Sequence, residues 1–143
     1  MTKTSPDAML VLEDGTVNNR IQAFDLGGNP LPYFTGQKDP YFLYLTATEG
    51  SVYLDLAVEF SGYIYVLSRK ESLSGFSFRL DIYHPSQSKS QPICTTTGMN
   101  AARLTVDFWR SVYTLNYERL KLPSGAYPGI TEPSVSFWLP RSG

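Results

Sequence analysis

Two stretches of the sequence, LAVEFSGYIYVL at 56–67 and LTVDFWRSVYTL at 104–115, align without a gap at a spacing of 48 residues. Both fit the pattern L-x-V-[ED]-F-x-x-x-[IV]-Y-[VT]-L, in which apolar residues alternate as in a β-strand on either side of a short turn. An agreement of this length indicates an internal repeat rather than a coincidence. The repeat therefore governs the interpretation of the whole chain.

A further strand of the unit recurs three times, as RIQAFDL at 20–26, RLDIYHP at 79–85 and SVSFWLP at 134–140. In this alignment Ile21, Leu80 and Val135 correspond, as do Phe24, Tyr83 and Trp138. Counted in order, the sequence predicts about ten strands, with a polar loop at 69–75, in an incomplete first unit at 8–47 and further units at 52–97 and 100–140. Four-stranded antiparallel units at such a period are typical of β-propeller blades.

The units resemble the NHL repeat, whose blades carry the patterns D-x-A-V-D, G-N-I-Y-V and N-R-I-Q-V-F-D. The closest matches are LDLAVEFSGYIYVLS at 54–68 and NNRIQAFDLGG at 18–28. The chain departs from the family where Trp109 and Arg110 replace the Gly-Asn turn and where Ser134 replaces the arginine. The resemblance implies an all-β fold of antiparallel, four-stranded propeller blades in one domain over residues 1–143.

The number of units predicts association. A closed ring of this type needs about six blades, so the chain supplies about half of a β-propeller. Each blade packs both faces against neighbours, and an open half-ring leaves apolar faces in water. Three arrangements remain open: a head-to-tail pair of copies, strand addition to another propeller-containing protein, or a piece of a longer propeller. Residues 1–60 carry three basic and eight acidic residues, and residues 61–143 carry nine and five. This split fits either head-to-tail contact or charges that are scattered and solvated.

Composition restricts the class of protein. The 143 residues suffice for one domain, and 42% hydrophobic residues exclude global disorder. The sequence shows neither an apolar run long enough for a membrane span nor a secretory signal, which predicts a cytoplasmic protein. A net charge of −1 counts against nucleic acid as a partner.

The sequence offers little for catalysis, so we expect no enzyme and no cofactor. The chain has one cysteine, Cys94, and one histidine, His84, too few for a catalytic zinc site, which takes three protein ligands. We expect Cys94 to be a half-buried strand thiol and His84 to lie at a solvated strand end. The strand carboxylates are expected to bond within turns or face solvent: Asp55, Glu59, Asp81 and Asp107.

The aromatic residues divide into two groups. Phe108 and Tyr113 have counterparts in the other copy and are predicted to lie in the core between blades. Those without counterparts, with the neighbouring arginines, are the predicted partner-binding residues: Trp109, Arg110, Tyr117, Arg119 and Tyr127. The sequence thus predicts a non-enzymatic protein–protein interaction and assembly module. The alternative is a propeller surface that binds a glycan or another small molecule.

Overall fold

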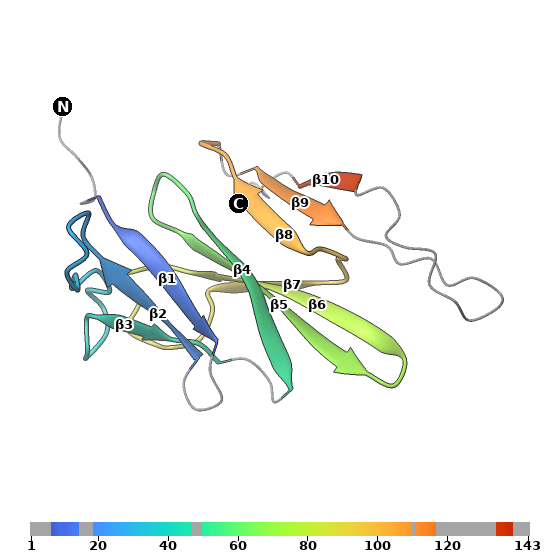
Figure 1. Ribbon diagram of the computed structural model, residues 1–143, viewed down its shortest axis with the longest axis horizontal. Coiled ribbons are helices and arrows are strands. Elements are labelled where there is room, and N and C mark those ends of the chain that lie inside the picture. The colour runs from blue at the N-terminus through green and yellow to red at the C-terminus, as the bar shows by residue number, and fades with distance from the viewer. Residues whose placement is uncertain (1–6, 15–18, 47–49, 110, 117–133, 139–143) are drawn as a thin grey trace.

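The computed structural model describes residues 7–14, 19–46, 50–109, 111–116 and 134–138, and within them it contains strands and no helix (Figure 1). In chain order the strands are β1 (Met9–Asp14), β2 (Asn19–Phe24), β3 (Phe42–Tyr44), β4 (Ser51–Val58), β5 (Ile64–Ser72), β6 (Gly75–Tyr83), β7 (Cys94–Thr97), β8 (Arg103–Val106), β9 (Val112–Asn116) and β10 (Ser134–Trp138). The prediction of an all-β chain with antiparallel pairing is confirmed.

Three sheets follow one another along the chain, with the orders β1-β2-β3, β4-β5-β6-β7 and β10-β9-β8. Each strand pairs with its neighbour in sequence, so every sheet is a simple meander. The sheet of β4 to β7 lies between the other two in space, and β8 runs beside β4 (Figure 1). We call these the first, middle and third sheets.

Two apolar clusters hold the sheets together, one on each face of the middle sheet. Along β5, Ile64 and Val66 pack into the first cluster with Ile21 of the first sheet. Tyr65 and Leu67 point the other way, into the second cluster with Leu104 and Val112 of the third sheet. This two-sided burial explains why β5 reads as an unbroken apolar run, because a strand buried on both faces has no polar face to show.

The two copies of the sequence pattern occupy matching positions in the middle and third sheets. Their strand pairs keep the same register at the 48-residue spacing: Leu56 with Val66 and Val58 with Ile64, then Leu104 with Thr114 and Val106 with Val112. The next strand pairs also correspond: Met9 with Phe24, Ile64 with Tyr83, and Val112 with Trp138. In this register β1 corresponds to β5 and β9, the second strands of the other sheets.

Polar contacts join the first strands of the middle and third sheets. The Leu104 N–H donates to Asp55 Oδ2 over 2.9 Å, and the Arg103 guanidinium donates to the Leu54 carbonyl over 3.3 Å. Asp55 follows an irregularity in the β4–β5 register, which turns this carboxylate toward the third sheet. These bonds fix β4 and β8 side by side.

The polar loop predicted at 69–75 is wrong. β5 continues to Ser72 and β6 begins at Gly75, with these two residues paired across a two-residue turn. The end of this hairpin is exposed and extends beyond the core, so its residues carry no apolar alternation. The Arg69 guanidinium lies 4.5 Å from the centre of the Phe76 ring and packs across the hairpin in place of a core contact.

Candidate interaction surface

The turn between β8 and β9 is organised by the Asp107 carboxylate. Asp107 Oδ1 accepts the N–H groups of Trp109 and Ser111, each over 2.9 Å, and Oδ2 accepts the Tyr113 hydroxyl over 3.0 Å. Burial raises the pKa of Asp107, but these hydrogen bonds outweigh it and hold the pKa below the usual range. The same bond to Asp107 raises the pKa of Tyr113. The carboxylate therefore fixes the turn in its ionised form.

The turn between β4 and β5 is closed in the same way. The Glu59 N–H donates to the Tyr63 carbonyl over 3.0 Å, as the Asp107 N–H donates to the Ser111 carbonyl 48 residues later. The Tyr65 hydroxyl donates to Glu59 Oε2 over 3.4 Å. Glu59 and Asp107 thus bond within turns, which agrees with the structural role expected from the sequence.

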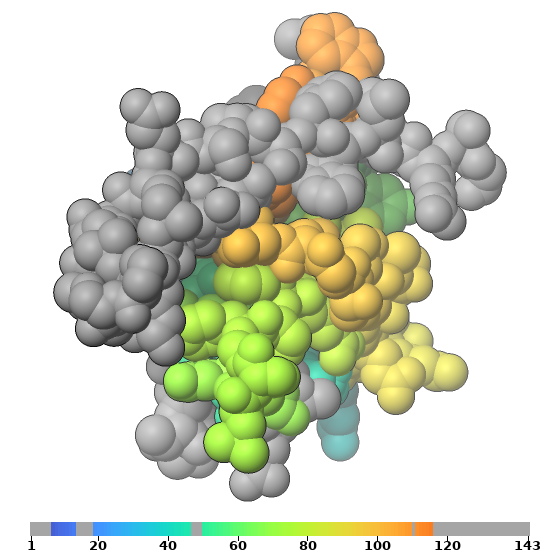
Figure 2. Space-filling view, turned by 90° about the vertical axis from the view of Figure 1, so that its right-hand side faces the viewer, coloured from blue at the N-terminus to red at the C-terminus, as the bar shows by residue number. Residues whose placement is uncertain are grey.

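Three aromatic rings next to these turns form an exposed surface that we call the aromatic ridge: Phe60, Phe108 and Trp109. The Phe60 and Phe108 ring centres lie 4.6 Å apart, and those of Phe108 and Trp109 lie 5.7 Å apart. The three side chains are 62%, 60% and 76% exposed. In Figure 2 the orange segment that contains the β8–β9 turn projects at the top of this face. The ridge thus presents touching rings to solvent.

One prediction about the residues of this ridge is wrong, and several of the predicted partner-binding residues lie outside the described part of the chain. Phe108 was predicted to lie in the core between blades, but the strand ends at Val106, so its ring lies beyond the sheet. Trp109 is exposed, as a partner-binding role requires. The other predicted partner-binding residues lie outside the described part of the chain: Arg110, Tyr117, Arg119 and Tyr127. The sequence signal for Phe60 was its place directly after the V-E strand end, where the turn begins.

The outer face of the first sheet is a second apolar surface. Leu10, Ile21 and Leu43 point inward to the first cluster, so the alternate residues of these strands lie on the opposite face. Their large side chains are exposed or half-buried: Met9, Val11, Phe24, Phe42 and Tyr44. On the same face the Arg20 guanidinium lies 4.0 Å from the Phe42 ring centre and pairs with Glu13. This face is apolar enough to pack against another sheet.

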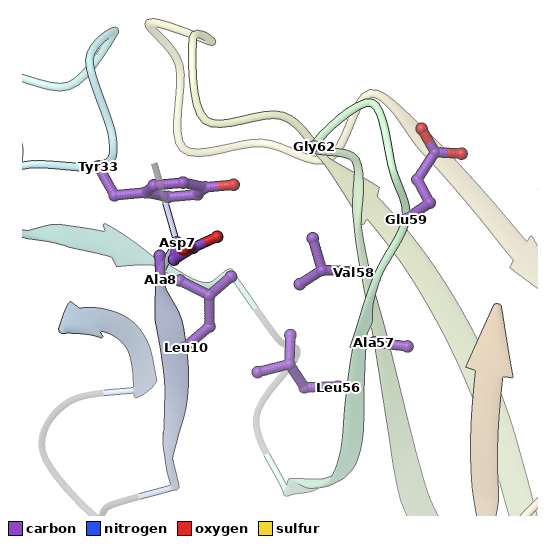
Figure 3. A pocket seen from close by; sticks show the side chains of 9 residues that line it. All are labelled: Asp7, Ala8, Leu10, Tyr33, Leu56, Ala57, Val58, Glu59 and Gly62. Carbon is purple, nitrogen blue, oxygen red and sulfur yellow. The ribbon is translucent and has the colours of Figure 1, made fainter. Parts of the chain in front are cut away.

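A groove separates β1 from β4 at the junction of the first and middle sheets. It forms a pocket of about 310 Å³ between β1 and β4 (Figure 3). Leu10 of β1 and Leu56 and Val58 of β4 point into it, and Tyr33 and Gly62 close one end (Figure 3). The lining combines these aliphatic side chains with polar groups, and it includes Asp7 and Glu59. The strands β1 and β4 do not pair with each other.

The described residues form no candidate metal site. Within those residues no three His, Cys, Asp or Glu side chains come together in a way that could hold a metal ion. Cys94 lies on β7 as predicted, but its thiol is exposed rather than half-buried, because all four residues of this edge strand are exposed. The His84 ring is partly buried beside Tyr63, and its Nδ1 lies 2.7 Å from the Ser86 hydroxyl.

Another carboxylate, Asp81, is 2% exposed and has a structural role. Its Oδ1 accepts hydrogen bonds from the Arg79 guanidinium over 2.8 Å and from the Thr95 hydroxyl over 2.6 Å, which ties β6 to β7.

The chain matches no protein-family model and no curated protein. In the part of the chain that the structure describes, no helix could cross a membrane.

Proposed function

We propose that this chain is a non-enzymatic protein–protein interaction and assembly module built from NHL-like β-propeller blades. In this proposal copies of the chain associate to complete the ring. The three sheets support it, because they share strand register. In addition, corresponding positions of the first and middle sheets face the next sheet along the chain. Leu12 and Ile21 pack toward the middle sheet, as Leu67 and Leu80 pack toward the third. Propeller blades stack with this constant direction.

The observation that carries the proposal is the uncovered face of the first sheet. In the middle sheet the corresponding face packs against a neighbour, and Ile64 and Tyr83 on it are fully buried. Their counterparts on the first sheet are Met9, which is 45% exposed, and Phe24, which is half-buried. A repeat unit depends on neighbours for its stability, so this face favours a further sheet.

The test is the mass of the chain in solution. Light scattering across a range of micromolar concentrations should show an oligomer, or a complex if a partner is retained. Val11→Glu places a charge on the outer face and should shift the distribution toward monomer. Val52→Glu is the matched control, since Val52 is 43% exposed against 46% for Val11 and lies on β4 rather than on the first sheet. A 16 kDa monomer at every concentration contradicts self-association.

The aromatic ridge supports a second candidate function, the binding of a glycan or another small molecule. Exposed, touching rings provide flat apolar surfaces on which a sugar face can pack. Titration with a glycan panel should then change tryptophan emission in the wild-type protein and not in Trp109→Ala. An array without signal, together with unchanged emission, removes this candidate.

A further inference from the structure

The free edge of β1 is the starting observation. Within the described residues β1 pairs with β2 alone, whereas β5 pairs with β4 and β6, and β9 with β8 and β10. The shared register makes β1 the counterpart of β5 and β9, since Met9 pairs with Phe24 as Ile64 pairs with Tyr83. The first sheet therefore has second, third and fourth strands, and the described residues supply no first strand.

The other two sheets show where a first strand lies. β4 and β8 run antiparallel to the second strands of their sheets, with Val58 opposite Ile64 and Val106 opposite Val112. They also lie side by side across the sheet junction, joined by the bond from Leu104 to Asp55. A first strand on the first sheet would thus pair with β1 and flank β4.

The groove between β1 and β4 occupies this position. Leu56 and Val58 point into it from β4 (Figure 3). Their counterparts on β8, Leu104 and Val106, pack into the cluster with the middle sheet. Leu104 and Val106 of β8 pack on the side where β4, a first strand, lies. Leu56 and Val58 of β4 instead border an open pocket, and Val58 is 40% exposed.

We propose that the free edge of β1 accepts an extended segment of another polypeptide as an added antiparallel strand. Main-chain hydrogen bonds to β1 would give affinity, and alternate side chains lying in the groove would give specificity. The segment has the pattern L-x-V, which both first strands of this chain carry at Leu56–Val58 and Leu104–Val106. The acid that follows is not required, because Leu10 stands where Tyr65 and Tyr113 bond that acid.

This inference rests on the proposed assembly function and specifies one of its surfaces. The test uses the full chain and a synthetic peptide with the sequence of residues 51–60, SVYLDLAVEF, as the probe. We expect saturable binding by calorimetry or fluorescence anisotropy, with increased hydrogen-exchange protection over β1. Two further peptides carry backbone N-methyl groups at odd or at even positions, which removes N–H donors without changing side chains. The peptide whose methylated positions face β1 should not bind, and the other should bind.

Matched valine variants locate the site. Val58→Glu puts a charge into the groove and should weaken peptide binding by about tenfold or more, whereas Val52→Glu should leave binding unchanged. Equal binding by the two variants, no saturable binding, or insensitivity to both N-methylated peptides overturns strand addition. If Val58→Glu does not fold, the N-methylated peptides and wild-type protein still decide the question. Val11→Glu separates the two proposals, because it should reduce self-association while peptide binding remains.

Discussion

The Tyr65 hydroxyl reaches back across the β4–β5 turn to the Glu59 carboxylate, over 3.4 Å, and both side chains are buried. The same relationship joins Tyr113 to Asp107 across the β8–β9 turn, over 3.0 Å. A recurring bond at a recurring position shows that the tyrosine and the acid in the sequence pattern serve the turn. The rings of the aromatic ridge follow directly after these two acids.

Tyr65→Phe is expected to lower the free energy of unfolding by about 1 kcal/mol, because the buried Glu59 carboxylate loses a hydrogen-bond donor. Tyr113→Phe should also destabilise the fold. Urea denaturation followed by fluorescence measures both. Tyr41→Phe is the control, since Tyr41 is 40% exposed, and it should match the wild type. A wild-type midpoint for Tyr65→Phe contradicts the role given to this bond.

Stability should fall with acid through Asp25 and Asp107. Hydrogen bonds from Asn29 hold the pKa of Asp25 below its ordinary value of 3.8, and the pKa of Asp107 is lowered as described above. A carboxyl with a depressed folded-state pKa stabilises the fold above its unfolded pKa, and this contribution is lost as pH falls through the folded-state value. Thermal unfolding should show a lower Tm below about pH 4. The Tm of Asp25→Asn with Asp107→Asn should depend less on pH in this window, and an unaltered pH dependence argues against these two groups.

Leu67→Ala is expected to cost about 3 kcal/mol of unfolding free energy, because Leu67 is fully buried in the cluster between the middle and third sheets. Leu73→Ala makes the same chemical change at the fully exposed tip of the β5–β6 hairpin and should be neutral. Denaturant midpoints compare the two variants. Equal costs would mean that the second cluster does not hold the sheets together.

Trp109→Ala should change stability by no more than about 0.5 kcal/mol, because the ring is 76% exposed. If the aromatic ridge contacts another copy of the chain, the substitution should weaken self-association measured by light scattering or by pull-down of a tagged copy. Phe76→Ala, at an exposed ring on the β5–β6 hairpin, is the control. Association that responds equally to both variants assigns no role to the ridge.

The sequence predicted most of the strands, but through different signals. β4 and β5 were recognisable because their apolar residues recur at 104–115, and β7 because PICTTT follows a turn-rich segment. The end of β5 at 69–72 was assigned to a loop, since this part of the strand extends into solvent and no face there needs apolar residues. This end of the hairpin is held by main-chain pairing between β5 and β6, which leaves no pattern in the side chains.

The candidate surfaces were predictable only in part. Trp109 was singled out because it lacks a counterpart, yet Phe108 was assigned to the core because it has one in Phe60. Repetition identifies equivalent positions, but it does not say whether those positions face inward or outward. Burial of Phe108 depends on whether the strand continues past Val106, and the Asp107 hydrogen bonds end it there.

The constant direction of the three sheets makes the two ends of the stack chemically different. Joining two identical ends would not continue the stack, whereas extending it requires the front of one copy to meet the back of the next, as two half-rings do at both junctions around a two-fold axis through the ring centre. Such head-to-tail contacts produce either a closed ring with a fixed number of copies or an open fibre whose length grows with concentration. The angle between neighbouring sheets, repeated from copy to copy, would choose between them.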